Sequence, residues 1–225
     1  MIFEPIMISL KIACVATGFV LVIGVLLGRG FAKYTFKGKD VLEVFILLPM
    51  VLPPSVAGYG LLLLMGKKGW IGSILYEVFG ISFVFHWLGG CIAAIVVSLP
   101  LMYQSCKAAF LNVEGRYEDA ARMLGASPKM VFTKITLPLA WPGIMSGIVL
   151  SFARALGEFG ATLMVAGNIP GKTQTIPIAI YFAVESGNIR TANILMMVVL
   201  AFSFTIVYVL NGWLKKKDYR VNNGV

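Results

Sequence analysis

Charged residues are scarce in this chain: they make up 13% of its 225 residues, against about a quarter in soluble domains. Hydrophobic residues account for 59%, and the mean hydropathy is +0.88. These proportions exclude an ordinary soluble domain and indicate a membrane protein. The net charge of +9 does not indicate nucleic-acid binding, because the basic residues lie in short loops between apolar stretches, where they set membrane orientation.

Residues that carry chemistry are also few. The only histidine, His86, stands beside Trp87 at the end of an apolar stretch, and no second carboxylate lies near Glu158 inside its stretch. The cysteines are odd in number and form no Cys-x-x-Cys, which argues against disulfides and a metal site; they are Cys14, Cys91 and Cys106. We therefore expect no catalytic residue and no bound metal, and a membrane-embedded enzyme is a remote alternative.

The sequence contains no Gly-x-x-x-x-Gly-Lys-Ser/Thr loop, the motif that holds nucleotide phosphates in many ATPases. If the chain takes part in ATP-driven work, ATP and its Mg²⁺ must be bound by a partner. We expect this chain itself to bind no cofactor.

Five stretches are long and apolar enough to cross a bilayer, which takes about 20 residues. They span roughly 6–28, 41–65, 83–106, 139–166 and 192–214. The sequence thus predicts an all-α, polytopic membrane protein with about five transmembrane helices in a single domain over residues 1–225.

Basic residues gather in alternate connections. Thirteen lie in 29–40, 107–137 and the C-terminal tail, and four lie in the two connections between these. Because cytoplasmic loops carry the excess of Lys and Arg, the predicted orientation puts the N-terminus outside and the C-terminus in the cytoplasm of a cell membrane.

The one long polar interruption, residues 112–138, has the pattern of two short helices. Glu118 and Arg122 are four residues apart and can pair on one helix face. Gly125 is expected to end the first helix, Ser127 to cap the second, and Leu137-Pro138 to stop the second. Ala121 and Gly125 leave a shallow patch, so we expect a cytoplasmic two-helix knob for docking.

Two apolar stretches contain features that suit a transport pathway. In the second, Pro53, Pro54 and Ser55 interrupt the helix, either as part of the pathway or as a packing kink. In the fourth, Arg154 and Glu158 form the only charged pair deep in an apolar segment, with Thr162 one turn further on. Since charges are costly in lipid, this pair is either a gate element or a structural ion pair.

A shorter apolar run, 175–184, is too short to span and is expected to be re-entrant or interfacial on the outer side. It would suit reception of a binding protein or plain packing over the pore mouth.

The polar interruption resembles the cytoplasmic coupling loop of permeases from binding-protein-dependent ABC importers. Their pattern is Glu-Ala-Ala, three residues, Gly, nine residues, Ile, one residue, Leu-Pro. The matching residues are Ala120, Ala121, Gly125, Ile135, Leu137 and Pro138, while Asp119 takes the glutamate position with Glu118 just before it. The resemblance implies a type I importer permease fold whose coupling loop contacts the ATPase.

Residues 47–74 and 153–181 further resemble the molybdate permeases of this class. That resemblance implies a homodimeric pore, two copies of a cytoplasmic ATPase and an extracytoplasmic molybdate-binding protein, and no nucleic acid. Gly157 to Gly160 is also similar to sulfate/thiosulfate permeases, so sulfate and tungstate stay open as substrates. A passive channel is a remote alternative that would leave the coupling loop without a purpose.

Overall fold

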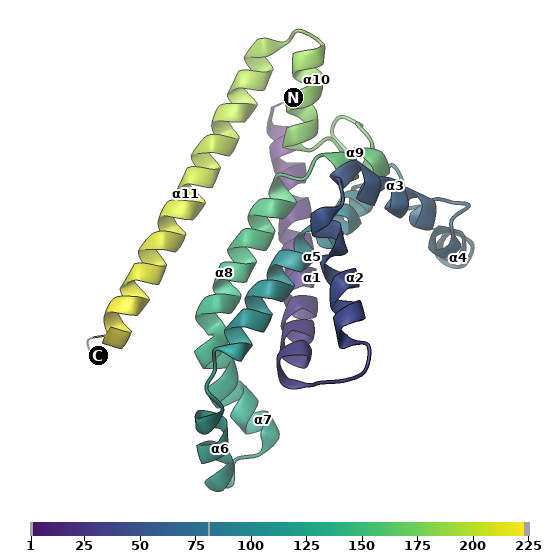
Figure 1. Ribbon diagram of the computed structural model, residues 1–225. Coiled ribbons are helices and arrows are strands. Elements are labelled where there is room, and N and C mark those ends of the chain that lie inside the picture. The colour runs from purple at the N-terminus through teal and green to yellow at the C-terminus, as the bar shows by residue number, and fades with distance from the viewer. Residues whose placement is uncertain (1, 81, 223–225) are drawn as a thin grey trace.

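The computed structural model describes residues 2–80 and 82–222, and within these ranges the chain is helical with no strand, which confirms the predicted all-α class. Figure 1 shows the arrangement of the helices. They are α1 (Phe3–Lys33), α2 (Lys39–Val51), α3 (Pro54–Met65), α4 (Trp70–Phe79), α5 (Trp87–Leu111), α6 (Gly115–Met123), α7 (Pro128–Val131), a π-helical segment η1 (Phe132–Thr136), α8 (Leu137–Leu156), α9 (Gly160–Ala166), α10 (Ile176–Glu185) and α11 (Ile189–Asn222).

Helices α1, α5 and α8 form the centre of the bundle because small residues let their backbones approach closely. A Cβ atom added at Gly28 of α1 would lie 2.6 Å from Cys106 Cβ of α5. One added at Gly143 of α8 would lie 2.6 Å from Ala109 Cβ of α5. A buried apolar cluster around Met102 fills the space between the three helices.

Within the described residues, four helical segments are long and apolar enough to cross a membrane, or five if the bent pair α2–α3 counts as one span. The other four are α1, α5, the continuous run Pro128–Leu156 and Ile189–Ile206 of α11. The multi-pass architecture expected from the sequence is therefore present. The third predicted span, 83–106, begins later than expected, since His86 caps α5 and the helix runs on to Leu111.

The second predicted span, 41–65, is not one straight helix. It bends by 115° between α2 and α3. Leu52, which precedes a proline, is extended with ψ 141°, as the proline ring requires of its neighbour. Pro53 and Pro54 then start α3, where their missing N–H groups cost nothing.

The fourth predicted span, 139–166, is also divided. Helix α8 ends at Leu156, and a separate short helix, α9, follows after residues 157–159. The Glu158 side chain accepts a hydrogen bond from the Ala161 N–H at 2.8 Å, so a carboxylate takes up an amide that a continuous helix would bond internally. The interruption is thus stabilised by a side chain from within the apolar stretch.

Leu137-Pro138 does not stop the second helix of the polar interruption, contrary to the sequence-based prediction. Helix α7 continues through η1 into α8. In η1 the Leu137 N–H donates to the Phe132 carbonyl five residues back. This wider turn leaves room for the Pro138 ring, which would clash with the carbonyl of residue 134 in a regular α-helix.

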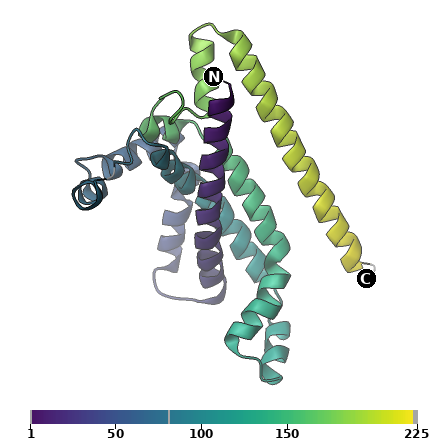
Figure 2. The same ribbon diagram turned by 180° about the vertical axis from the view of Figure 1, so that it is seen from behind.

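The two ends of the bundle carry different elements (Figures 1 and 2). One end holds α6, α7 and the loop between α1 and α2, and the other holds the N-terminus and α10. The predicted short apolar segment is α10, which packs on α11 and on the start of α1, where Ser9 Oγ accepts from the Ile176 N–H at 2.7 Å. The basic side chains of the predicted cytoplasmic tail, Lys215, Lys216, Lys217 and Arg220, lie outside the side chains described.

Candidate functional site

The elbow formed by α6 and α7 projects beyond the end of the bundle (Figure 1). Gly125 adopts φ +83°, a conformation that favours glycine, and the turn is closed by two bonds: Gly125 N–H to Arg122 O and Ala126 N–H to Ala121 O. Ser127 then caps α7 by accepting from the Met130 N–H at 3.3 Å. Local sequence signals therefore build the two-helix elbow as predicted.

Glu118 anchors the elbow to the bundle. Its carboxylate accepts a hydrogen bond from Thr136 Oγ1 at 2.5 Å, pairs with Arg122 at 2.7 Å and lies 4.0 Å from Lys33 Nζ at the end of α1. The Thr136 hydrogen bond is the main reason that the pKa of Glu118 is lowered, aided by Lys33, Arg122 and Arg29 and opposed by partial burial. The side chain thus joins α6, α1 and η1.

A small cavity of about 130 Å³ lies beside this carboxylate, between the end of α1 and the elbow. Arg29 borders it, with its guanidinium carbon 3.6 Å from the centroid of the Phe132 ring. Of the two basic side chains at this end of α1, Lys33 is therefore directed at Glu118 of the elbow and Arg29 at Phe132 of η1.

The residues predicted to contact an ATPase divide into two groups. Asp119, Ala120 and Gly125 are exposed on the elbow and Pro138 is exposed at the start of α8, while Glu118, Ala121, Ile135 and Leu137 are partly buried. Met123 and Leu124, which were not among the residues predicted from the sequence, are 90% and 89% exposed at the tip of α6. An apolar pair directly before the helix-ending Gly125 was the signal available in the sequence.

The second candidate site is the meeting of the two interrupted helices. A Cβ atom added at Gly160 would lie 3.1 Å from Pro54 Cβ and 3.3 Å from Ser55 N, and one at Gly58 would lie 2.7 Å from Ala161 Cα. The backbones of α3 and α9 therefore touch where both helices begin. This contact brings the start of α3 next to the interruption between α8 and α9, where Glu158 lies. The residues concerned at the start of α3 are all exposed: Pro53, Pro54 and Ser55. The sequence did not indicate this proximity.

At this junction Arg154 and Glu158 are ion-paired, with Arg154 Nη1 2.6 Å from Glu158 Oε2. The Glu158 side chain is 1% exposed and that of Arg154 is 32% exposed, so the cation is the accessible partner. Thr162 is buried and its methyl group faces Gly90 of α5. Of the three predicted pathway residues on this segment, Arg154 has an accessible charged group, whereas Glu158 and Thr162 are buried.

An all-α bundle with several membrane-crossing helices, two interrupted helices and a projecting helical elbow defines a multi-pass transport permease. The chain belongs to the family of binding-protein-dependent transport system inner membrane components, which it matches over residues 21–217.

Curated relatives cover nearly the whole chain. It is 44% identical over 206 residues to a putative molybdenum transport system permease protein of Bacillus subtilis, covering 92% of this chain and 91% of the relative. It is 43% identical over 215 residues to the molybdenum transport system permease protein of Escherichia coli K12, covering 95% and 93%. A probable sulfate transport system permease protein of Chlorella vulgaris is 34% identical, covering 93% and 80%.

Solved structures agree on the fold. A bacterial ABC transporter that imports alginate matches with a TM-score of 0.77 at 16% identity, covering 95% of this chain and 79% of that chain. The methionine ABC transporter MetNI matches with a TM-score of 0.70 at 15% identity, covering 96% and 95%. The predicted type I importer permease fold is thereby confirmed.

Proposed function

We propose that this chain is the permease subunit of an ATP-driven importer that takes molybdate into the cytoplasm. The observation that carries the proposal is its 40–44% identity, over more than nine-tenths of its length, to permeases named for molybdenum transport. Permeases named for sulfate transport are 33–35% identical. Sulfate, thiosulfate and tungstate are the alternative substrates, because they are tetrahedral oxyanions of the same charge.

In this proposal two copies of the chain form the pore, and each elbow docks on a separate cytoplasmic ATPase that binds ATP and Mg²⁺. ATP binding closes the ATPase dimer, draws the elbows together and converts the pore from inward-open to outward-open. Glu118 supports this coupling because it joins α6 to α1 and η1, so that movement of the elbow is passed to two membrane-crossing segments.

An extracytoplasmic binding protein delivers the anion at the other end. One alginate importer of the same fold was solved with a "periplasmic protein", which supports a partner of this kind. Along the pathway we assign Arg154 a weak attraction for the oxyanion, with Pro53, Pro54 and Ser55 beside it and Glu158 and Thr162 behind it. Because the Glu158 carboxylate already pairs with Arg154, the attraction of Arg154 for the anion stays weak enough for the anion to leave.

Uptake competition tests the substrate. Cells that express this chain with its cognate ATPase and binding protein should accumulate labelled molybdate, and excess unlabelled molybdate should suppress uptake far more than excess sulfate. If sulfate competes equally, the substrate assignment is wrong while the permease assignment stands. Parallel competition with tungstate separates the third candidate.

Enlarging the exposed face of α6 tests the coupling. Ala120→Phe adds bulk to an exposed position of the proposed contact, and Thr205→Phe adds the same ring at an exposed position of α11, outside the coupling loop. We expect Ala120→Phe to reduce ATPase co-purification and uptake by at least tenfold, and Thr205→Phe to leave both near wild type. Unchanged co-purification and uptake in Ala120→Phe would show that α6 is not the docking element.

A further inference from the structure

A second cavity lies at the end of the bundle opposite the elbow and has no part in the proposed function. It measures about 420 Å³ and is formed by α1, the residues that lead into α5, and the loop between α9 and α10. Its side chains combine basic and apolar character; among them are Lys11, Lys172, His86, Trp87, Phe85 and Ile8.

The cavity is electropositive. Lys11 Nζ lies 3.6 Å from the centroid of the Trp87 ring, and neither Lys11 nor Lys172 belongs to an ion pair among the residues described. No lining residue is acidic; Glu4 lies close to Gly171 on one wall. His86 Nδ1 accepts from the Leu88 N–H at 3.3 Å, which leaves the Nε2 hydrogen of His86 free to donate.

The loop between α9 and α10 forms one wall of the cavity, and its backbone N–H groups are used in hydrogen bonds within the loop. The N–H groups of Lys172, Thr173 and Gln174 all donate to the Ile169 carbonyl. Thr173 Oγ1 accepts from the Ile169 N–H at 3.0 Å. A ligand would therefore be held by the side chains of Lys11, Lys172 and His86 rather than by a nest of free amides.

The cavity stands at the depth of lipid headgroups. Lys11 and Arg29 are the charged residues that bound the apolar part of α1. The eighteen helical steps from Lys11 to Arg29 rise about 27 Å, close to the roughly 30 Å of a bilayer's hydrocarbon core. Trp87, against Lys11, is a residue type enriched at this interface. Ile8 and Phe85 extend the cavity wall with apolar surface.

We propose that this cavity is a binding site for a tetrahedral oxyanion group, supplied by the phosphodiester of an anionic phospholipid. The two lysines and His86 meet the phosphate oxygens, and the aromatic and aliphatic wall meets the glycerol and the first methylenes of the acyl chains. A free oxyanion has the same charged group without the apolar part, so it is the second source that the experiment must separate.

Native mass spectrometry of the purified, delipidated full chain tests the site. The probes are phosphatidylglycerol and phosphatidylcholine of matched acyl chains. The variant is Lys11→Gln with Lys172→Gln, and the control is Lys68→Gln, another exposed lysine that lies outside the cavity. We expect wild type and Lys68→Gln to retain phosphatidylglycerol in preference to phosphatidylcholine. Each lysine near a lipid headgroup contributes about fivefold to affinity, so the double variant should bind phosphatidylglycerol about 25-fold more weakly.

Equal retention of the two lipids, or equal phosphatidylglycerol binding by the double variant and wild type, would overturn the proposal. A different result would be that inorganic phosphate or sulfate at millimolar concentration displaces the lipid from wild type but no longer binds to the double variant. That result would assign the cavity to a free oxyanion and overturn the proposal of a phospholipid ligand. Should the double variant fail to fold, Lys172→Gln alone, in the exposed loop, should lower affinity about fivefold and reduce the rise in Tm caused by phosphatidylglycerol. None of these readouts depends on transport.

Discussion

At the scale of single residues, the carboxylate of Glu158 does two things at once. One oxygen accepts from the Ala161 N–H and the other pairs with Arg154. A buried carboxylate is tolerated only with such partners, because its desolvation is costly. The Glu158 carboxylate therefore stabilises the junction of α8 and α9, while the Arg154 guanidinium is the accessible partner of the pair. A gate role for the pair stays a prediction.

Glu118 offers a test by pH. Because its pKa is lowered below the usual value of 4.5, it stabilises the fold above that pH, and the stabilisation is lost as the pH falls through the lowered value. We expect Glu118→Gln to lower Tm at pH 7, since hydrogen bonds to a charged group contribute about 1.5–3 kcal/mol. Thermal unfolding in detergent should show the difference in Tm from wild type shrinking as the pH falls below 4.5.

The matched control is Asp119→Asn. Asp119 is 67% exposed, and among the residues that the structure describes its side chain bonds only to the same Arg122, so its removal should cost less than about 1 kcal/mol. A Glu118→Gln variant with an unchanged Tm, or with the same loss at pH 4 and pH 7, would contradict the anchoring role assigned to Glu118.

At the scale of elements, sequence signals differ in what they predict. The prolines at 53 and 54 predict an interruption because they act locally, and the structure places it there. The end of α8 was missed because the apolar run continues through 166, and the break depends on a carboxylate bonding forward to Ala161. The elbow was predictable from its glycine and its serine cap, whereas η1 depends on how α7 meets α8.

The contact between α3 and α9 is testable with two glycines of one helix. A Cβ atom at Gly58 would lie 2.7 Å from the Ala161 backbone, while one at Gly60 would meet nothing within 4 Å. Alanine in place of a helical glycine stabilises by up to about 1 kcal/mol where there is room. We expect Gly60→Ala to hold or raise Tm, and Gly58→Ala to lower it by separating α3 from α9.

Measuring uptake by the two variants shows whether the contact between α3 and α9 only stabilises the fold or also lines the route of the anion. If the junction of the interrupted helices lines the route of the anion, Gly58→Ala should also change uptake at a temperature where it stays folded. Equal Tm values for Gly58→Ala and Gly60→Ala would refute the close approach of the two helices.

At the scale of the whole molecule, the chain alone leaves apolar surface uncovered. Along α11, Met197, Leu200 and Phe204 are 61%, 56% and 73% exposed, and Trp70 on the projecting α4 is 85% exposed. Bilayer lipid covers such surface without cost, and a second copy of the chain would also cover it. Composition and hydropathy were enough to predict this surface; which part faces lipid and which faces a partner depends on contacts between chains.

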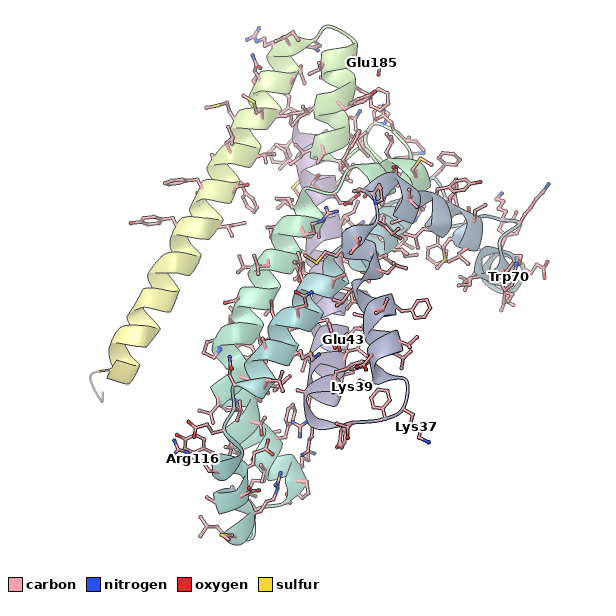
Figure 3. All side chains as sticks on the ribbon, viewed as in Figure 1. Lys37, Lys39, Glu43, Trp70, Arg116 and Glu185 are labelled. Atoms are coloured by element: carbon pink, nitrogen blue, oxygen red, sulfur yellow. The ribbon has the colours of Figure 1, made fainter. Side chains whose placement is uncertain are left out.

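The orientation of the molecule in the membrane is the last prediction. Figure 3 places Arg116 at the elbow end and Glu185 at the opposite end. The excess of basic residues in the elbow and in the loop between α1 and α2 predicts that the elbow end is cytoplasmic. In a background with Cys14, Cys91 and Cys106 replaced by alanine, we expect Glu185→Cys to react with a membrane-impermeant maleimide from outside intact cells.

Arg116→Cys should react only after the cells are permeabilised, because in the predicted orientation this exposed position lies on the cytoplasmic side of the membrane. The two positions serve as controls for one another, since both are exposed and differ only in the end of the bundle they occupy. The reverse pattern would put the elbow outside, where no ATPase can reach it, and the coupling mechanism would fail together with the orientation. Labelling of both from outside would mean that the chain does not insert with a single orientation, which a steep charge difference between its two ends disfavours.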